Sequence, residues 1–385
     1  MKITETEKHL TKLMPELSRS NSISCLNFIY SEKNNLHVTN LDCSLVLKNT
    51  GTPWGKCINR EMFKKTKSIS QSIDENEIDF SEYPIIKWGI EKAVELKSTD
   101  FLIAAQDVKQ FVSNDYTTRV SLTGVNVSFK DSEVCGTDGH RAGINKFEYS
   151  YNTESISETK LHQNIKDLEF ILSVQAVTHL NYIIENFEVK IYVDNSQILA
   201  IGPDIQYSHK LIEGPYPNYK RTIPTDFKTE ISVDKNQCAE LMAGLKAIMP
   251  HTQTQTRKIS MQGNRIVSNN GENPKHIDLS FEFSKKTGFN CFYMLEIVKN
   301  FAPFTFKANG PIGATLFQNG DKLRVLMPLR QLEGEENNSI GEKIDFEIKK
   351  PKNKTRTAAM VINIIKKNKN LTGAEILNIL AKENQ

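Results

Sequence analysis

The sequence predicts an α+β protein built from three copies of one module, and three observations support this. Amphipathic helical patterns recur along the chain, at 6–18, 99–113 and 232–248. Alternating apolar and polar residues, typical of β-strands, follow each of these helices, at 24–48, 119–146 and 257–283. A second helical pattern then appears in each copy, at 59–69, 173–187 and 290–301. Each module therefore contains a helix, strands, a second helix and further strands.

Local signals mark several of the element boundaries. Asp100 and Asp234 are expected to cap the helices predicted at 99–113 and 232–248, by accepting hydrogen bonds from the free N–H groups of the first turn. Polar turns separate the strands in every copy. The final strands of copies two and three, at 189–212 and 305–329, contain the hairpin turns "DNSQ" and "QNGD".

The first copy is shorter than the other two. Only residues 70–84 follow its second helix, where the others have a full set of strands. Past residue 331 the composition becomes polar, so "LEGEENNSIGEK" (332–343) is expected to be a linker. A segment rich in Lys and Arg follows, and two short helical patterns indicate a small helical hairpin. We therefore expect four parts, at 1–97, 98–225, 226–331 and 332–385.

The composition limits the class of protein. The 385 residues are 38% hydrophobic and 25% charged, which is typical of a soluble protein of two to four domains. The charged start "MKITETEKHL" does not resemble an export signal. Six scattered cysteines without a CxxC pair predict reduced, buried thiols and a cytoplasmic location, not a disulfide frame or a zinc site. A net charge of +3 is too small to indicate nucleic-acid binding by itself.

No catalytic constellation is recognisable, so we expect neither an enzyme nor a bound cofactor or metal. "GTPWGK" (51–56) resembles a phosphate-binding loop, but it has three residues between its glycines and precedes a strand. The eight histidines have no metal-ligand spacing, and no serine or cysteine carries a nucleophile motif. Paired carboxylates occur in solvated runs such as "DENEID" (74–79).

The stretch "TDGH" (137–140) allows two interpretations. An Asp, a His and an Arg lie close together around Gly139, as they do in many active sites. The Asp-Gly pair also fits a tight hairpin turn, in which Gly supplies the left-handed backbone conformation. The residues alone favour the turn.

Three segments together resemble the sliding clamp of bacteria, the beta subunit of DNA polymerase III. They are "GTDGHRAGI" (136–144), "LIEGPYPNYKRTIP" (211–224) and "LRVLMPLR" (323–330), in the expected order and spacing. Weaker similarity occurs at 34–47 and 287–301. The resemblance covers residues 1–331. It implies three repeated clamp domains and a head-to-tail homodimer ring with helices lining the hole and sheets outside. It also implies a non-catalytic processivity factor whose partners are double-stranded DNA, the polymerase catalytic subunit and the clamp loader.

The resemblance further implies a pocket between the second and third domains that binds short peptide motifs of partner proteins. Carried over residue by residue, this pocket contains Leu122, Thr137, Gly139, His140, Arg141, Ala142, Pro217, Arg221, Thr222, Val325, Leu326, Met327, Pro328, Leu329 and Arg330. Aliphatic side chains with a few polar groups suit the apolar anchors of a peptide. Ala142 replaces a larger aliphatic residue of the family, which implies a wider pocket.

Basic residues on or beside the repeat helices are candidates for contact with DNA phosphates. They are Lys8, Lys12, Arg60, Lys64, Lys65, Lys67, Lys109, Arg119, Lys246 and Lys299. A solvated helix face would carry such residues equally well.

Two departures from the family leave alternatives open. The first domain lacks an edge strand that the family uses in ring closure, and "NEIDF" (76–80) is at most its remnant. The extension at 332–385 either covers the pocket, delivers basic helices to DNA or a partner, or only adds solubility. The rival to a clamp is therefore a divergent paralogue that does not encircle DNA and acts as a protein-interaction module.

Overall fold

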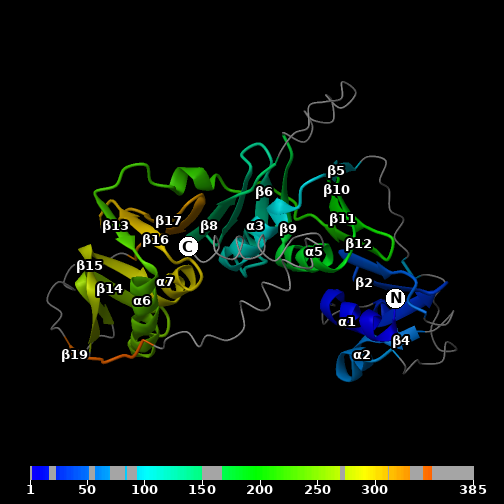
Figure 1. Ribbon diagram of the computed structural model, residues 1–385, viewed down its shortest axis with the longest axis horizontal. Helices are drawn as coiled ribbons and strands as arrows, with labels where there is room; N and C mark the ends of the chain where they lie inside the picture. The colour runs from blue at the N-terminus through cyan, green and yellow to red at the C-terminus, as the bar shows by residue number, and fades with distance from the viewer. Residues whose placement is uncertain are drawn as a thin grey trace, which may run out of the picture.

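The computed structural model describes residues 2–16, 23–51, 57–69, 83–84, 93–149, 167–268, 274–310, 312–329 and 341–348. Three units follow one another along the chain (Figure 1). The loop-like stretch at 52–56, the "NEIDF" segment and the expected helical hairpin lie outside these residues. None of the helices within them is long and apolar enough to cross a membrane.

Helices open and divide the units where the apolar periodicity predicts them. The first helices are α1 (Ile3–Leu13), α3 (Asp100–Val108) and α6 (Lys235–Ile248), and the second are α2 (Arg60–Thr66), α5 (Val174–Asn186) and α7 (Cys291–Val298). The cap at Asp234 is confirmed, because its carboxylate accepts from the N–H groups of Asn236 and Gln237 at 2.7 and 2.8 Å. The prediction for Asp100 is wrong: Thr99 holds the cap position, and Asp100 is the first helical residue.

The first eight-stranded sheet joins the first unit to the second. Its strands are β1 (Phe28–Glu32), β2 (Asn35–Thr39), β3 (Cys43–Leu47), β4 (Cys57–Asn59), β5 (Val94–Leu96), β10 (Lys190–Val193), β11 (Gln197–Ile201) and β12 (Ile205–Lys210). The order in space is β4-β1-β2-β3-β12-β11-β10-β5. The join is antiparallel between β3 and β12, where Cys43 to Leu47 pair with His209 to Ile205.

A second eight-stranded sheet joins the second unit to the third in the same manner. Its strands are β6 (Gly124–Ser128), β7 (Glu133–Thr137), β8 (Arg141–Lys146), β9 (Glu169–Ser173), β13 (Thr229–Val233), β16 (Phe304–Ala308), β17 (Thr315–Asn319) and β18 (Lys322–Leu326). The order is β13-β16-β17-β18-β8-β7-β6-β9, and the join is the antiparallel pair β8 and β18. At both joins, the third strand of one unit, β3 or β8, pairs with the strand that ends the second set of strands in the next unit, β12 or β18.

The third unit ends in a smaller sheet of two long strands and a short one. β14 (Lys258–Ser268) pairs with β15 (Lys275–Asn290) along its whole length, with register shifts around Gly263. β19 (Glu342–Lys343) adds to the other edge of β15 in parallel. The expected linker is thus wrong at its end, because part of 332–343 forms a strand on the third unit.

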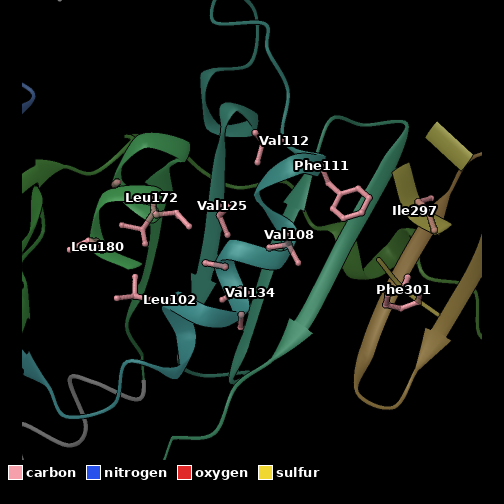
Figure 2. Packing of buried hydrophobic residues seen from close by; sticks show 14 of the residues in the cluster. Leu102, Val108, Phe111, Val112, Val125, Val134, Leu172, Leu180, Ile297 and Phe301 are labelled. Carbon is pink, nitrogen blue, oxygen red and sulfur yellow. The ribbon is translucent and has the colours of Figure 1, made fainter. Parts of the chain in front are cut away.

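The core lies between these sheets and the helices. In Figure 2, Leu102 and Val108 of α3 lie among Leu172, Leu180, Val125 and Val134, while Phe111 lies on the side that faces Ile297 and Phe301. All six cysteines are buried and none forms a disulfide, as the sequence predicts.

Candidate functional site

The "TDGH" stretch forms the turn between β7 and β8. Asp138 donates its N–H to the carbonyl oxygen of Arg141 at 3.3 Å, and Gly139 has φ +87°. The Asp138 carboxylate accepts from the N–H groups of His140 and Arg141 at 2.9 and 3.0 Å. The hairpin is confirmed, although its two central residues are Gly139 and His140 instead of Asp138 and Gly139.

Alternation along β8 and β18 divides the junction of the second and third units into two faces. Val325 pairs with Ala142, and Leu326 pairs with Arg141. Since successive side chains of a strand point to opposite faces, Ala142 and Val325 share one face while Arg141 and Leu326 share the other. The first we call the outer face, and the second the helix face.

The outer face carries a small apolar cluster that is separate from the main core. Tyr219 packs against Ala142 and Val325 there, and the half-buried Tyr216 packs beside them. The Tyr216 hydroxyl donates to the carbonyl oxygen of Cys135 at 3.0 Å, and burial raises the pKa of this phenol. Lys220 holds the same loop to the sheet through an ion pair with Asp131 at 2.7 Å. The three segments that carry the family resemblance therefore meet on this face.

The predicted pocket residues separate into a buried group and an exposed rim, and Leu326 of the buried group lies on the helix face. Leu122, Thr137, Ala142, Val325 and Leu326 are buried. Pro328 and Leu329 are partly exposed, while the solvent-exposed members are Gly139, His140, Pro217, Arg221, Thr222 and Met327. The Met327 N–H donates to the carbonyl oxygen of His140 at 2.9 Å, which places two rim residues side by side. Arg330 lies outside the described residues.

Arg141 does not belong to the exposed rim, since its side chain is 7% exposed and lies on the helix face. Its guanidinium forms ion pairs with Asp138, at 3.0 Å, and with Glu296 of α7. The same group stacks over the ring of Tyr293, 4.4 Å from the ring centre. Arg141 thus ties the two units together, and its charge is already neutralised.

Arg324 is a second buried arginine on the helix face, and the sequence analysis did not single it out. Its guanidinium lies over Phe301 at 4.6 Å and over Phe111 at 5.2 Å, and it donates to Asn145 Oδ1 at 2.8 Å. Burial lowers its pKa to about 10. The alternation of "LRVLM" offers a signal, because it puts Arg324 on the same strand face as the core residue Leu326. No comparable signal identifies its partners Phe111, Asn145 and Phe301, which come from other segments.

Two cavities accompany the junctions. One of about 270 Å³ lies on the helix face, lined by Gln106, Lys109, Phe301 and Arg324 among others. Another of about 980 Å³ lies at the join of the first and second units, beside the start of β3 and the end of β12. We call the exposed rim beside the outer-face cluster the outer-face patch; it consists of Gly139, His140, Pro217, Arg221, Thr222 and Met327. Neither cavity lies at this patch.

Most of the predicted DNA-facing residues are exposed. Lys8, Lys12, Lys64, Lys65 and Lys246 lie on α1, α2 and α6, while Lys67 and Lys299 follow the ends of α2 and α7. Lys109 lies just after α3 and donates to the hydroxyl of Thr178 on α5 at 2.8 Å, and burial lowers its pKa. Arg119 is exposed and lies in a loop.

Arg60 is a correction to that set. Its side chain is 1% exposed, so it cannot meet a phosphate. Its guanidinium donates to the carbonyl oxygens of Leu26 and Thr39 at 2.9 and 3.0 Å, and also to that of Pro15. Because these carbonyls come from three separate segments of the first unit, Arg60 serves as an internal brace.

No family model matches the sequence. Curated relatives include the beta sliding clamps of Streptococcus pneumoniae, 23% identical over 57% of this chain, and of Staphylococcus aureus, 24% identical over 58%. The DNA polymerase III beta chain of Streptococcus pneumoniae superposes with a TM-score of 0.67 at 18% identity, over 85% of this chain and 97% of its own. The Bacillus subtilis sliding clamp gives 0.66 at 19%, over 86% and 97%.

The chain has the fold of a bacterial sliding clamp. The expected α+β class with three repeated clamp modules is confirmed, and so is the resemblance to that family. The matched region spans 58% of the Streptococcus pneumoniae relative and 59% of the Staphylococcus aureus one.

Proposed function

We propose that the protein is a DNA sliding clamp, a non-catalytic processivity factor that encircles duplex DNA and tethers a replicative polymerase. The observation that carries the proposal is the pair of continuous sheets across both unit joins, with helices toward one side of the arc (Figure 1). This repeated join would extend to a second copy arranged head to tail. Exposed lysines on α1, α2 and α6 would contact phosphates without reading sequence.

The outer-face patch would bind peptide motifs of the polymerase and the clamp loader. Met327 and Pro217 supply exposed apolar contact, and Arg221 supplies a charge at the rim. Half-exposed apolar groups beside a rigid sheet suit the anchors of a short peptide. Arg141 is left out of this role, since its guanidinium is committed to the helix face.

Retention on circular DNA tests the encircling role. The protein is incubated with linear plasmid DNA, onto whose ends a closed ring can thread. The DNA is then circularised with ligase, and bound protein is separated by gel filtration before and after the circle is cut again. A ring stays on the circle and slides off the linear form, whereas a protein that binds only phosphates is released equally from both. Equal release would contradict the proposal.

Substitution at the rim tests the docking role. Met327→Asp places a charge where a peptide's apolar anchor would lie, and we expect it to lower affinity for a fluorescent polymerase motif peptide at least ten-fold. Leu326 is unsuitable for this test because it is fully buried. Leu41→Asp is the matched control, since Leu41 and Met327 are both 40% exposed and Leu41 lies near the other join. Equal affinities for all three proteins would exclude the patch.

One observation favours the alternative of a non-encircling interaction module. The outer edge of β15, at the end of the third unit, is already paired with β19. The alternative would be supported by a protein that stays monomeric, binds the peptide, and is released from circular DNA as fast as from linear DNA.

A further inference from the structure

Residues 341–348, which we call the tail segment, pack on the third unit although they follow its last strand. Glu342 and Lys343 of the segment pair in parallel register with Lys275 and His276 of β15. The Ile344 N–H donates to the carbonyl oxygen of His276 at 2.8 Å, and His276 Nδ1 lies 2.8 Å from the carbonyl oxygen of Gly341. Backbone bonding of this kind defines an added strand.

Side chains reinforce the same contact. Ile344 and Phe346 are half-buried against the main core, and the Phe346 ring lies over Gly244 of α6, where a Cβ would be 3.6 Å from it. Lys343 forms an ion pair with Asp278 at 3.0 Å, and Lys275 forms one with Glu342. Ile348 is 48% exposed and so is not part of this contact. The tail segment therefore has an inward apolar side and a solvent side.

The edge that it occupies is equivalent to the two edges that join units. β3 and β8 each precede a further short strand, β4 or β9, that leads directly into the second helix, and each pairs with the next unit. In the third unit the first half of β15 holds that place, because β15 pairs with β14 on one side and its C-terminal half leads directly into α7. The edge of β15 that faces away from β14, which the tail segment occupies, is the one that a further unit would join.

That edge is closed off at a second point as well. The Ser280 N–H donates to a carboxylate oxygen of Glu240 on α6 at 2.7 Å. Open strand edges attract other strands, and charged groups or short covering strands are known means of preventing this. The cis contact is short, with two residue pairs against five at β3·β12 and four at β8·β18. A partner strand as long as those at the two joins would make more backbone hydrogen bonds with this edge than the tail segment does.

We propose that the tail segment is an intramolecular strand that competes with a second copy of this chain for the edge of β15. While it is bound, the third unit cannot join another copy, and its release opens the edge for ring closure. This inference rests on the proposed clamp function, because it assumes that the edge is used between copies.

Two full-length variants set the tail segment free or hold it in place. Ile344→Asp/Phe346→Asp buries charge in the contact and should release it, with Ile348→Asp as the matched control. Lys275→Cys/Glu342→Cys should form a disulfide when oxidised, since the two residues are opposite each other on neighbouring strands and their side chains already meet in an ion pair. The native cysteines are all buried, so they should not interfere.

Self-association is measured by sedimentation velocity over a range of concentrations. The released variant should dimerise with a dissociation constant about 5- to 150-fold lower than the native chain and the Ile348→Asp control. The oxidised lock should stay monomeric where its reduced form dimerises. Because the lock adds a bond instead of disrupting the core, it guards against a released variant that simply misfolds.

Two results overturn the inference, and they differ in what else they exclude. If all variants, locked and released, dimerise alike and are retained on circular DNA, the tail segment has no control over the edge and the clamp proposal stands. If no variant dimerises at any concentration and none is retained on circles, the edge is not an interface between copies, and the clamp proposal fails with it.

Discussion

Replacing Arg141 with Met should weaken the joined second and third units far more than it weakens peptide docking. The guanidinium lies between two carboxylates and over an aromatic ring on the helix face. Methionine keeps much of the side-chain volume but removes the charge and its hydrogen bonds. Asp138 and Glu296 are then left without their cation.

The structure sets the size of the loss. Breaking a fully buried ion pair by removing one partner costs about 3–5 kcal/mol. Here the Asp138 side chain is 12% exposed and that of Glu296 is 27% exposed, so water can partly solvate the carboxylates that remain. We therefore expect the free energy of unfolding to fall by about 3 kcal/mol, at the lower end of that range. Arg141→Lys should recover less than half, because an ammonium carries its donors on one compact nitrogen and lacks the planar fork with which the guanidinium spans both carboxylates.

Urea unfolding followed by far-ultraviolet circular dichroism measures the change in the free energy of unfolding. A double-mutant cycle with Glu296→Gln isolates the contribution of the Arg141–Glu296 ion pair. We expect a coupling free energy above about 1 kcal/mol and a peptide affinity, per folded molecule, within about two-fold of native. A change in unfolding free energy below about 0.5 kcal/mol, with peptide binding lost, would show that Arg141 faces the peptide after all.

Three further predictions concern the fold and the DNA surface. Gly136→Ala should destabilise by about 2 kcal/mol, since a Cβ there would lie 2.4 Å from the carbonyl oxygen of Val108, whereas Gly313→Ala meets nothing closer than 3.8 Å and should be near neutral in thermal unfolding. Burial lowers the pKa of His179 to about 4, so as the pH falls the unfolded chain binds a proton at this histidine before the folded chain does. The free energy of unfolding should therefore drop by about 1.4 kcal/mol per pH unit from pH 6.5 toward 4. In urea titrations His179→Gln should lack this part of the pH dependence. Lys8→Gln/Lys12→Gln should reduce the salt dependence of DNA binding by up to about 0.9 per lysine in the log–log slope, while Lys33→Gln, in the turn between β1 and β2, should leave it unchanged.

Local signals in the sequence were sufficient for the elements and their order. Five of the six predicted helices lie within their predicted ranges, while α1 begins three residues before its range and ends at Leu13; the turns at 137–140, 194–197 and 318–321 all connect paired strands. These features depend on neighbours a few residues apart, which is why periodicity and turn chemistry reveal them. The wrong cap at Asp100 shows the limit of such reasoning, because Thr99 and Asp100 both fit the pattern.

Side-chain orientation depended on contacts that are distant in the chain. Arg60 resembles the exposed lysines beside it, yet three carbonyl groups from other segments surround it. Arg141 was placed in the pocket by resemblance, but α7, more than 140 residues away, takes its charge. The polar composition of 332–343 predicts a linker, although backbone bonds to His276 make part of it a strand.

The repeated module, its helices and strands, and the family it resembles can thus be read from residues that are near one another in the chain. Which strands join the units, which arginines are neutralised inside the junctions and which edge the tail segment covers were decided only in the folded molecule. Backbone groups at a strand edge and charges at an interface have no intrinsic partner; they acquire one when packing brings a distant segment within hydrogen-bonding distance.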